Sequence, residues 1–334
     1  MKTSSPWRLG RRLAPWLSSL VAAGLCLSSA HVRAQDAYPA KPIHMVLSTS
    51  PGGGADITMR IIAPKLQERL GQPVVIENRP GASGMIAGAY VARQPADGYT
   101  FLVDIASFPV NPALYPRMGY DPFKDLAPVT QNIQAPNVLL VPPGSPVKSV
   151  GGFITYAKAR KGAMSYASSG NGSAQHLAME LFKLQEGIEL THVPYKGGGA
   201  ALADVMAGHV DAYIGFLPTA APGIKSGRLI ALATTGKTRD PSTPNLPTMA
   251  EAGVAGFVSY DWNGVFAPAA TPRPIIDRIQ REIAAILAEP DVKARLAEMG
   301  SEPVASTPEQ FGKFLHQEAA KWAKVVKDAR ISVE

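Results

Sequence analysis

The chain lacks the cysteines on which disulfides and thiolate metal sites depend. Cys26 is its only cysteine among 334 residues, so no internal disulfide can form and a zinc site would miss its usual ligands. The six histidines are scattered without an H-E-x-x-H pattern, and no G-x-S-x-G sequence is present. Because these patterns mark metalloproteases and serine hydrolases, the sequence predicts no metal, no cofactor and no catalytic residue.

Acidic side chains are missing from the first 34 residues. That segment has an apolar, uncharged stretch from 13 to 30 and ends in the small-residue pattern Val32-Arg33-Ala34. Its basic residues are Lys2, Arg8, Arg11, Arg12 and Arg33. The order of basic, apolar and small residues predicts a secretory signal peptide that is cleaved near Ala34. A retained membrane anchor is the alternative, which is disfavoured because Pro15 and several serines interrupt the apolar stretch.

A strong charge of one sign is also absent once this segment is removed. The whole chain has 33 lysines and arginines against 26 acidic residues, and without the five basic residues of the signal peptide the balance is 28 against 26. A nearly neutral chain offers no basic surface for nucleic acid, so we expect no nucleic-acid partner. The mature chain then has no thiol either, which suits an oxidising compartment, and we expect it in the periplasm.

Short apolar segments alternate with helical patterns from residue 43 onward. We expect strands at 43–47, 74–77, 99–104, 138–141, 164–167, 190–193, 212–216 and 229–233. One helix between the first two strands would pack through a face formed by Ile57, Ile61, Ile62, Leu66 and Leu70. This alternation predicts the α/β class, with mostly parallel sheets covered by helices on both faces.

The last 60 or so residues follow a different pattern, with two helices and no strand between them. One helical stripe runs from Ile275 to Leu287, and the capping box Thr307-Pro308-Glu309-Gln310 predicts that the last helix starts near Pro308. Helices without strands must cover a sheet built elsewhere in the chain. We therefore expect two α/β domains, 38–137 plus 262–334 and 138–261, with a central ligand cleft and two strand-like crossings as the hinge.

Four glycine-rich loops follow predicted strands. They read SPGGGAD (50–56), RPGASG (79–84), SSGNGS (168–173) and YKGGGA (195–200). In parallel α/β sheets ligands bind at this edge, where the unpaired N–H groups of the following helices favour an anion. We expect the helix after the second strand to begin at Ala82–Gly84. Any one such loop could be only a tight connection, but four of them favour an anion site, and none matches a nucleotide fingerprint.

Three side chains in or just after these loops, His176, Asp56 and Lys196, have both a structural and a ligand-binding interpretation. Ser173 is placed to cap a helix, so His176 would lie in the first turn, neutral, and bonded either locally or to a ligand. Asp56 is placed either to cap the start of a helix or to bind the ligand directly. Lys196 could reach a carboxylate or remain solvated.

Longer segments of the chain resemble a known family. They include the opening stretch 38–103 with STSPGGGAD and ENRPGASG, YASSGNGSAQHLAMELF (166–182), HVPYKGGGAALADVMAGHVDAYI (192–214), LPTMAEAG (246–253) and WNGVFAPAATP (262–272). These resemble the Bug-type periplasmic solute receptors of tripartite tricarboxylate transporters over nearly the whole mature chain. The resemblance implies a periplasmic binding protein-like fold (type II) that closes on a small carboxylate and delivers it to membrane components of such a transporter. We expect a monomer.

The resemblance also implies which residues bind the ligand. On the first domain these are Ser50, Pro51, Gly52, Gly53, Asp56, Ala82, Ser83, Gly84 and Ser107, with Asn111 beside them. On the second domain they are Ser168, Ser169, Asn171, Ser173, His176, Lys196 and Gly197, and Phe216 offers an apolar wall.

Two positions depart from the family pattern. Ser48-Thr49 stand where relatives often have proline and an aromatic residue, and Gly215 stands where many have aspartate. Without that acid a ligand ammonium loses a partner, so we expect di- or tricarboxylates, or an aromatic carboxylate, to bind better than amino acids. A receptor that feeds a sensor kinase would share the fold and ligand. A secreted hydrolase would need a nucleophile and base such as Ser173 and His176.

Overall fold

The computed structural model describes residues 1, 3 and 38–333. The predicted signal peptide and its cleavage near Ala34 therefore lie outside the described residues. Residues 41–334 form one of two units of the chain, and the fold below is that of this unit. Within the described part of the chain, no helix is both long and apolar enough to cross a membrane.

Two groups of strands build the sheet. The first contains β1 (Ile43–Leu47), β2 (Val74–Asn78), β3 (Thr100–Ile105), β9 (Tyr260–Pro268), β10 (Glu302–Pro303) and the first part of β4 (Leu126–Val141). Here β1 pairs in parallel with β2 and β3, whereas β9 runs antiparallel to β3 and β4. The second contains β5 (Ser165–Ser168), β6 (Thr191–Pro194), β7 (Ala212–Phe216), β8 (Ile230–Thr234) and the end of β4.

Strand β4 joins the two groups. It pairs with β9 from Leu126 to Pro136 and then with β7 from Asn137 to Leu140. The sequence predicted only its last four residues, because prolines and a polar segment at 130–132 interrupt the apolar pattern. In the fold all three polar side chains are buried, and Asn132 Nδ2 donates to Asn263 Oδ1 at 2.9 Å. The predicted strand at 138–141 is thus the end of a strand of 16 residues.

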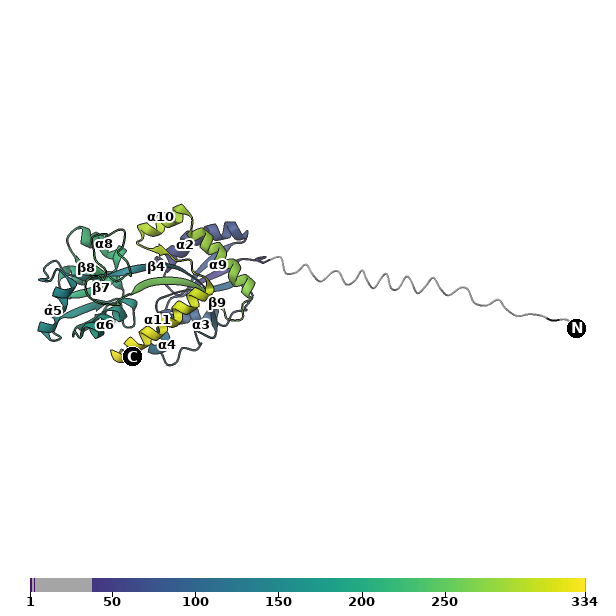
Figure 1. Ribbon diagram of the computed structural model, residues 1–334. Helices are drawn as coiled ribbons and strands as arrows, with labels where there is room; N and C mark the ends of the chain where they lie inside the picture. Colours follow the sequence, from purple (N-terminus) through teal and green to yellow (C-terminus); the bar gives the residue numbers. More distant parts are fainter. Residues whose placement is uncertain (2, 4–37, 334) are drawn as a thin grey trace. The chain divides into compact units, whose positions relative to one another are not determined.

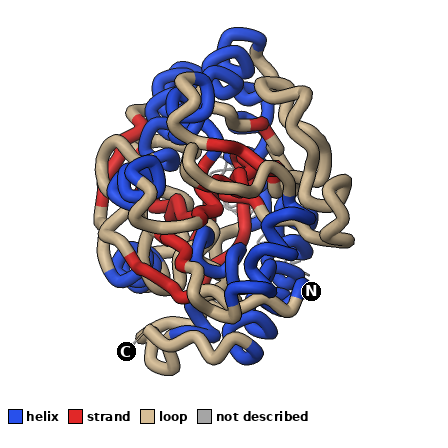
Figure 2. The backbone as a smooth tube through the Cα atoms, turned by 90° about the vertical axis from the view of Figure 1, so that its left-hand side faces the viewer, coloured by secondary structure: helices blue, strands red, loops and turns tan. Residues whose placement is uncertain are grey.

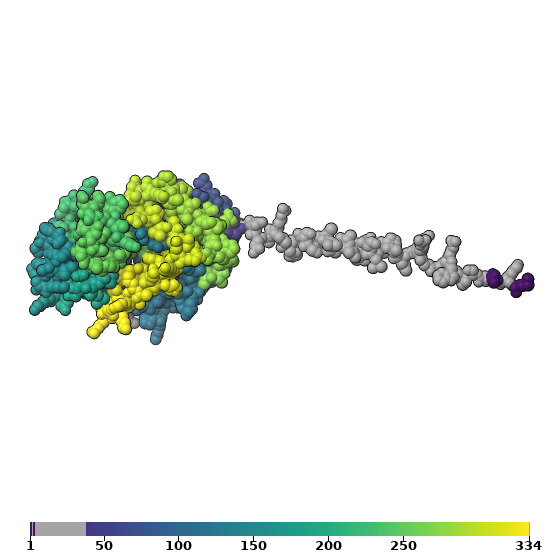
Figure 3. Space-filling model, viewed as in Figure 1, coloured from purple at the N-terminus to yellow at the C-terminus, as the bar shows by residue number. Residues whose placement is uncertain are grey.

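Helices cover the strands on both sides (Figures 1 and 2). Around the first group lie α2 (Gly54–Leu70), α3 (Met85–Val91), α4 (Asn111–Leu114), α9 (Arg273–Leu287), α10 (Pro290–Glu298) and α11 (Pro308–Asp328), and around the second lie α5 (Val150–Arg160), α6 (Ala174–Glu186), α7 (Gly198–Ala207) and α8 (Leu217–Lys225). The surface view shows α11 stretched across one face (Figure 3). Its inner side packs Trp322 in one apolar cluster with Leu114 of α4 and Leu177 of α6.

The remaining sequence predictions fare unevenly. The capping box of α11 is confirmed, with Thr307 and Gln310 bonded to each other's backbone. The prediction of no strand between the C-terminal helices is wrong, since β10 pairs with β4 there and α10 precedes it. Ile57 is 40% exposed, not part of the packed face. The inward positions at this end of α2 are taken instead by Asp56 and Thr58, which are bonded within the fold.

Candidate functional site

The loop 50–56 is organised by Asp56. Gly53 caps α2 with extended backbone, and the N–H of Gly52 donates to Asp56 Oδ2 at 2.9 Å. Arg60 Nε donates to the same oxygen at 2.8 Å, while Asn78 Nδ2 donates to Oδ1 at 3.1 Å. These donors, Arg60 first, outweigh the effect of burial and lower the pKa of Asp56 to about 2. The ionised carboxylate therefore binds neighbouring groups of the chain through both oxygens and fixes the backbone from Ser50 and Pro51 onward.

The turn 81–84 is strained. Gly81, Ala82, Ser83 and Gly84 all have positive φ, at 126°, 46°, 54° and 90°. The left-handed region costs about 1–2 kcal/mol for each residue that has a side chain, so Ala82 and Ser83 are held there by their surroundings. As predicted, helical structure starts at Ala82–Gly84, but it is a single 3₁₀ turn with Ser83 in the left-handed region, and α3 follows from Met85.

Contacts from the segment after β3 hold this turn in place. The carbonyl oxygen of Ser83 accepts from Asn111 Nδ2 at 2.9 Å and from Ser107 Oγ at 3.2 Å. The hydroxyl of Ser83 lies 3.0 Å from that of Tyr115. The structure thus brings Ser83, Ser107 and Asn111 together, as the resemblance implied, and Tyr115 joins them although no sequence pattern pointed to it.

A buried carboxyl group lies beneath the turn. Ser48 Oγ donates to Asp104 Oδ1 at 2.6 Å, and Asp104 is fully buried. A side chain at Gly84 would come within 2.9 Å of the same oxygen, so only glycine fits above it. Burial raises the pKa of Asp104 to about 7, against the opposing effect of the Ser48 hydrogen bond. The departure at Ser48 is therefore explained by a partner in β3.

The loop 168–173 is shaped by hydrogen bonds to histidines. Ser168 is buried, and its Oγ lies 2.6 Å from His192 Nε2. Gly172 adopts φ of 73°, and a side chain there would come within 2.6 Å of Leu114 in α4. This close approach brings the loop near the segment that carries Ser107 and Asn111. The polar ends of the two strand groups therefore lie next to each other at this point.

His176 is neutral and bonded within the loop. Ser173 caps α6 by accepting from the N–H of His176 at 3.3 Å, and the N–H of Gly172 donates to His176 Nδ1 at 3.0 Å. The ring stacks on His192 at 3.9 Å between centroids. Burial, followed by the charges of His192 and Lys183, lowers the pKa of His176 to about 3. Because Nδ1 accepts, Nε2 carries the hydrogen and can act only as a donor.

A pocket opens between the first turns of α6, α7 and α8. It is lined by Ser169, Gln175, Gly198, Leu202, Tyr213, Phe216 and Thr219, and its empty volume is about 340 Å³ including space open to solvent. Two predicted site residues, Ser169 and Phe216, are among these, and Gly197 lies next to Gly198 at the start of α7. Lys196 and Asn171 are exposed and lie outside this lining.

The space in front of Gly215 is filled by a neighbouring ring. A side chain built at Gly215 would come within 2.3 Å of the Tyr213 ring, two residues earlier on β7. An aspartate at this position would therefore displace Tyr213 from the pocket wall. The glycine expected as a departure from the family pattern is thus tied to a tyrosine in the pocket.

Behind the pocket, β9 contributes a carboxylate. Gln175 Nε2 donates to Asp261 Oδ2 at 3.0 Å, and Ser169 Oγ donates to Gln175 Oε1 at 2.6 Å. Burial raises the pKa of Asp261 to about 6, against the opposing effect of the Gln175 hydrogen bond. The same carboxylate adds to burial in raising the pKa of Tyr213. Sequence reasoning missed Gln175, Tyr213 and Asp261.

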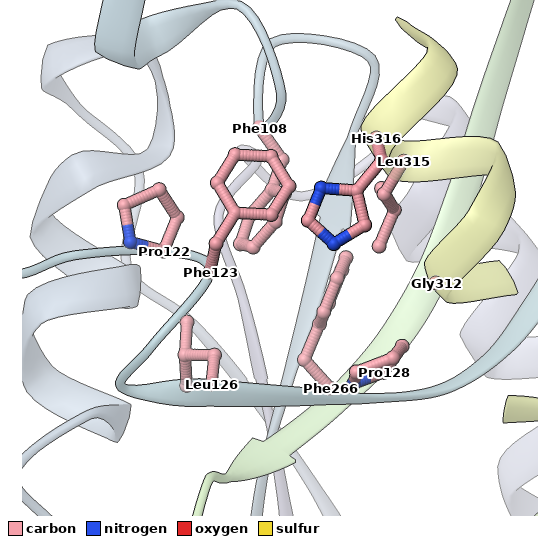
Figure 4. A pocket seen from close by; sticks show the side chains of 9 residues that line it. All are labelled: Phe108, Pro122, Phe123, Leu126, Pro128, Phe266, Gly312, Leu315 and His316. Atoms are coloured by element: carbon pink, nitrogen blue, oxygen red, sulfur yellow. The ribbon is translucent and has the colours of Figure 1, made fainter. Parts of the chain in front are cut away.

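A second pocket lies elsewhere, between β4, β9 and α11 (Figure 4). Aromatic and aliphatic side chains dominate it, including Phe108, Phe123 and Phe266, with an empty volume of about 290 Å³. His316 stacks on Phe123 at its edge, 5.0 Å between centroids. None of the site residues predicted from the sequence lines it, and it lacks the hydroxyl and amide groups of the first pocket.

Comparison with known proteins assigns the family. The model described as "Tripartite tricarboxylate transporter family receptor" matches residues 58–331. The chain belongs to this receptor family. Protein BugT of Bordetella pertussis is 38% identical to this receptor over 314 residues, which cover 92% of this chain and 96% of BugT. Members are non-enzymatic solute-binding proteins of the periplasm.

Solved structures of relatives share the receptor's fold. The structure of R. palustris Rpa4515 with adipate has a TM-score of 0.78 at 40% identity and covers 88% of the receptor and 99% of its own chain. MatC (Rpa3494) from Rhodopseudomonas palustris with bound malate has a TM-score of 0.74 at 31% identity, covering 86% and 100%. These matches confirm the mixed α/β, periplasmic binding protein-like fold expected from the sequence.

Proposed function

We propose that this receptor captures a small organic dicarboxylate between the loops at the ends of its two strand groups and presents it to membrane components of a tripartite tricarboxylate transporter. Relatives with 40% and 31% identity hold adipate and malate, which supports this ligand class. In the same proposal the two strand groups are the cores of two domains, 38–137 plus 262–334 and 138–261, with β4 and β9 as the hinge.

The observation that carries the proposal is the convergence of polar loops at Gly172 and Leu114. On one side lie the loop 50–56, the strained turn 81–84 and Ser107; on the other lie Ser168, Ser169, Ser173 and His176, with Lys196 and Gly197 farther out. Backbone N–H groups of glycine turns and helix starts supply donors for carboxylate oxygens without a paired arginine. A ligand with a carboxylate at each end would bind both sides at once, and this favours the closed state.

Calorimetric titration of the mature protein, refolded to remove retained ligand, tests the ligand class. We expect adipate or malate to bind with a dissociation constant in the micromolar range, about −8 kcal/mol, and aspartate and glutamate to bind more weakly. X-ray scattering should show a smaller radius of gyration with ligand. Absence of binding to every carboxylate would overturn the proposal, whereas preferential binding of aspartate would overturn only the ranking of ligands.

Two helix-cap variants separate a role in binding from a role in stability. Ser173→Ala and Thr307→Ala each remove a cap, at 3.3 Å and 3.2 Å from the backbone N–H that it accepts, and each should lower stability by about 1 kcal/mol. Only Ser173→Ala should also weaken ligand binding, because Thr307 caps α11 far along the chain from every predicted site loop. Equal loss of affinity in both variants would show that the loop 168–173 does not touch the ligand.

Export completes the proposal. We infer that the segment 1–34 directs the chain to the periplasm and is removed near Ala34. Amino-terminal sequencing of the protein recovered from a periplasmic extract should begin near Gln35, and an intact amino terminus would contradict the cleavage.

A further inference from the structure

Three polar side chains connect strand β9 to the pocket wall. Asp261 accepts from Gln175 Nε2 at 3.0 Å, and Gln175 Oε1 accepts from Ser169 Oγ at 2.6 Å. Ser169 and Gln175 line the pocket, whereas Asp261 lies behind them and is not part of the lining. The three residues come from β9, the first turn of α6 and the loop that follows β5.

The charge of Asp261 decides which way these hydrogen bonds run. An ionised carboxylate has no hydrogen to give, so the amide atom that faces it must be the nitrogen of Gln175. The amide oxygen then faces Ser169 and takes its only hydroxyl hydrogen. With that hydrogen committed, the Ser169 oxygen can offer the pocket only lone pairs, and it therefore acts as an acceptor toward a ligand.

We propose that Ser169, held as an acceptor by Gln175 and Asp261, makes the receptor select carboxylates that carry a hydroxyl group over the same carboxylates without one. The proposal rests on the proposed function, since it concerns the same carboxylate ligand and places it against the pocket wall that Ser169 lines. A hydroxyl gives its hydrogen to Ser169. A dicarboxylate without a hydroxyl group has only acceptor oxygens. These repel the lone pairs of the Ser169 oxygen, or the Ser169 oxygen accepts a hydrogen bond from water instead.

The rest of the pocket wall fits a hydroxyl better than an ammonium. Tyr213 supplies a second hydroxyl, placed beside Gly198, that can donate to the ligand hydroxyl oxygen. Leu202 and Phe216 are apolar, and no carboxylate belongs to the lining formed by the described residues. An ammonium would lose its hydration there without meeting a charge in direct contact, at a higher cost than a neutral hydroxyl.

Protonation of Asp261 would allow the Gln175 amide and the Ser169 hydroxyl to reverse their orientation. A neutral carboxyl can donate to the amide oxygen, which allows Gln175 to turn its nitrogen toward Ser169 and frees the serine hydrogen for a ligand carboxylate. Among the described residues, the titratable group that interacts with Asp261 is Tyr213 on β7, while Gln175 on α6 and Ala135, its neighbour on β4, carry no charge. Because burial raises the pKa of Asp261 to about 6, the carboxylate is ionised at pH 7.5.

Matched ligand pairs test the proposal at pH 7.5. Dissociation constants are measured by calorimetry for malate against succinate and for 2-hydroxyadipate against adipate. We expect the hydroxylated member to bind about tenfold tighter in the wild type, the effect of one hydrogen bond in place of a repulsive contact. In Asp261→Asn, whose amide can donate to Gln175, the ratio should fall to within about threefold, mainly because the plain acid gains affinity.

Two further variants keep the result interpretable. Ser169→Ala removes the acceptor and should abolish the preference for the hydroxylated acid, so the test survives if Asp261→Asn fails to fold. Asp277→Asn, a surface pair with Arg273 on α9, should leave the ratio unchanged. Equal binding of both members by the wild type, or a ratio that survives Asp261→Asn and Ser169→Ala, would overturn the proposal while leaving the receptor function intact. Failure to bind any of the four acids would overturn both.

Discussion

Asp56 and Asp104 are two buried carboxyl groups on the same side of the candidate site, and their pKa values shift in opposite directions. Asp56 is 1% exposed and Asp104 is fully buried. The pKa of Asp56 falls to about 2, whereas that of Asp104 rises to about 7. The difference lies in their partners. Asp56 accepts from Arg60, Gly52 and Asn78, while Asp104 accepts on one oxygen only.

The two carboxyl groups differ most in their second oxygen, which among the described residues is hydrogen-bonded in Asp56 but not in Asp104. Within the part of the chain that the structure describes, Asp104 Oδ2 has no hydrogen-bond partner, and neither does the buried hydroxyl of nearby Tyr120. The charge of each carboxyl group therefore follows from the balance between burial, which dominates at Asp104, and donors such as Arg60, which dominate at Asp56. Asp56 stabilises the loop 50–56 by being ionised, and Asp104 tolerates its place beneath Gly84 by holding a proton below neutral pH.

Removal of Asp56 should have the largest effect. In Asp56→Ala the N–H of Gly52 and the amide of Asn78 lose their acceptor, and Arg60 loses its ion pair. We expect a loss of about 3 kcal/mol in the free energy of unfolding at pH 7, measured by guanidinium titration. The wild-type contribution should be present above pH 3.8 and lost as the pH falls through about 2, since the folded pKa is the lower one.

A surface carboxylate provides the control for this variant. Asp277→Ala breaks an exposed pair with Arg273 and should change the free energy of unfolding by less than about 0.5 kcal/mol. If Asp56→Ala proved no more destabilising than Asp277→Ala, the three donors around Asp56 would not be stabilising the loop.

Asp104→Asn should stabilise the protein at alkaline pH, whereas Asp56→Ala destabilises it. The folded pKa of about 7 exceeds the ordinary value of 3.8, so the wild type loses stability as the pH rises from about 4 to 7, and the loss is complete above that. Asparagine does not titrate and avoids this loss. We expect the variant to gain about 2 kcal/mol at pH 8 relative to wild type and almost nothing at pH 4, measured as free energies of unfolding at both values. A variant that is equally affected at the two pH values would show that Asp104 is not titrating.

Ser48→Ala sharpens the comparison by removing the hydroxyl that donates to Asp104. Without that donor the ionised form is less favoured, so the pKa should rise further and the stability at pH 8 should fall by about 1 kcal/mol. The same substitution made together with Asp104→Asn should cost less, because the charge that it stabilises is gone. Additive free energies in this double-mutant cycle would contradict the coupling between the two side chains.

The short buried strands could be predicted from the sequence because each is a short apolar run, but the expectation of mostly parallel pairing is wrong, since β4 runs antiparallel to β7, β8, β9 and β10. Strand β4 could not be predicted in this way, since Thr130, Gln131 and Asn132 are polar by composition and buried only because Ser306 and Asn263 reach them from distant parts of the chain. Apolar patterns report burial, whereas a buried polar strand depends on partners that local sequence does not reveal.

The loops of the candidate site could be predicted from local sequence, whereas the side chains that orient these loops could not. Glycine and serine mark turns locally. By contrast, Asp104 and Asp261 are single acids in strands, and the sequence does not say which donors they meet. The signal that could have drawn attention to them is an acidic residue within an apolar strand, in TFLVDI and just before WNGVF. A buried acid of this kind is unusual and needs a hydrogen-bond donor.

The smallest expected effect concerns the strained turn above Asp104. In Ser83→Gly the left-handed conformation at φ of 54° becomes unstrained, but the unfolded chain gains freedom and the hydroxyl contact with Tyr115 at 3.0 Å is lost. The backbone bonds from Ser107 and Asn111 to the carbonyl of residue 83 remain. We expect a net change within about 1 kcal/mol and in the stabilising direction, measured by guanidinium titration. Tyr115→Phe, which removes only the hydroxyl contact, separates the two contributions. If Ser83→Gly were more destabilising than Tyr115→Phe, the left-handed conformation of Ser83 would not be strained, which would contradict the prediction.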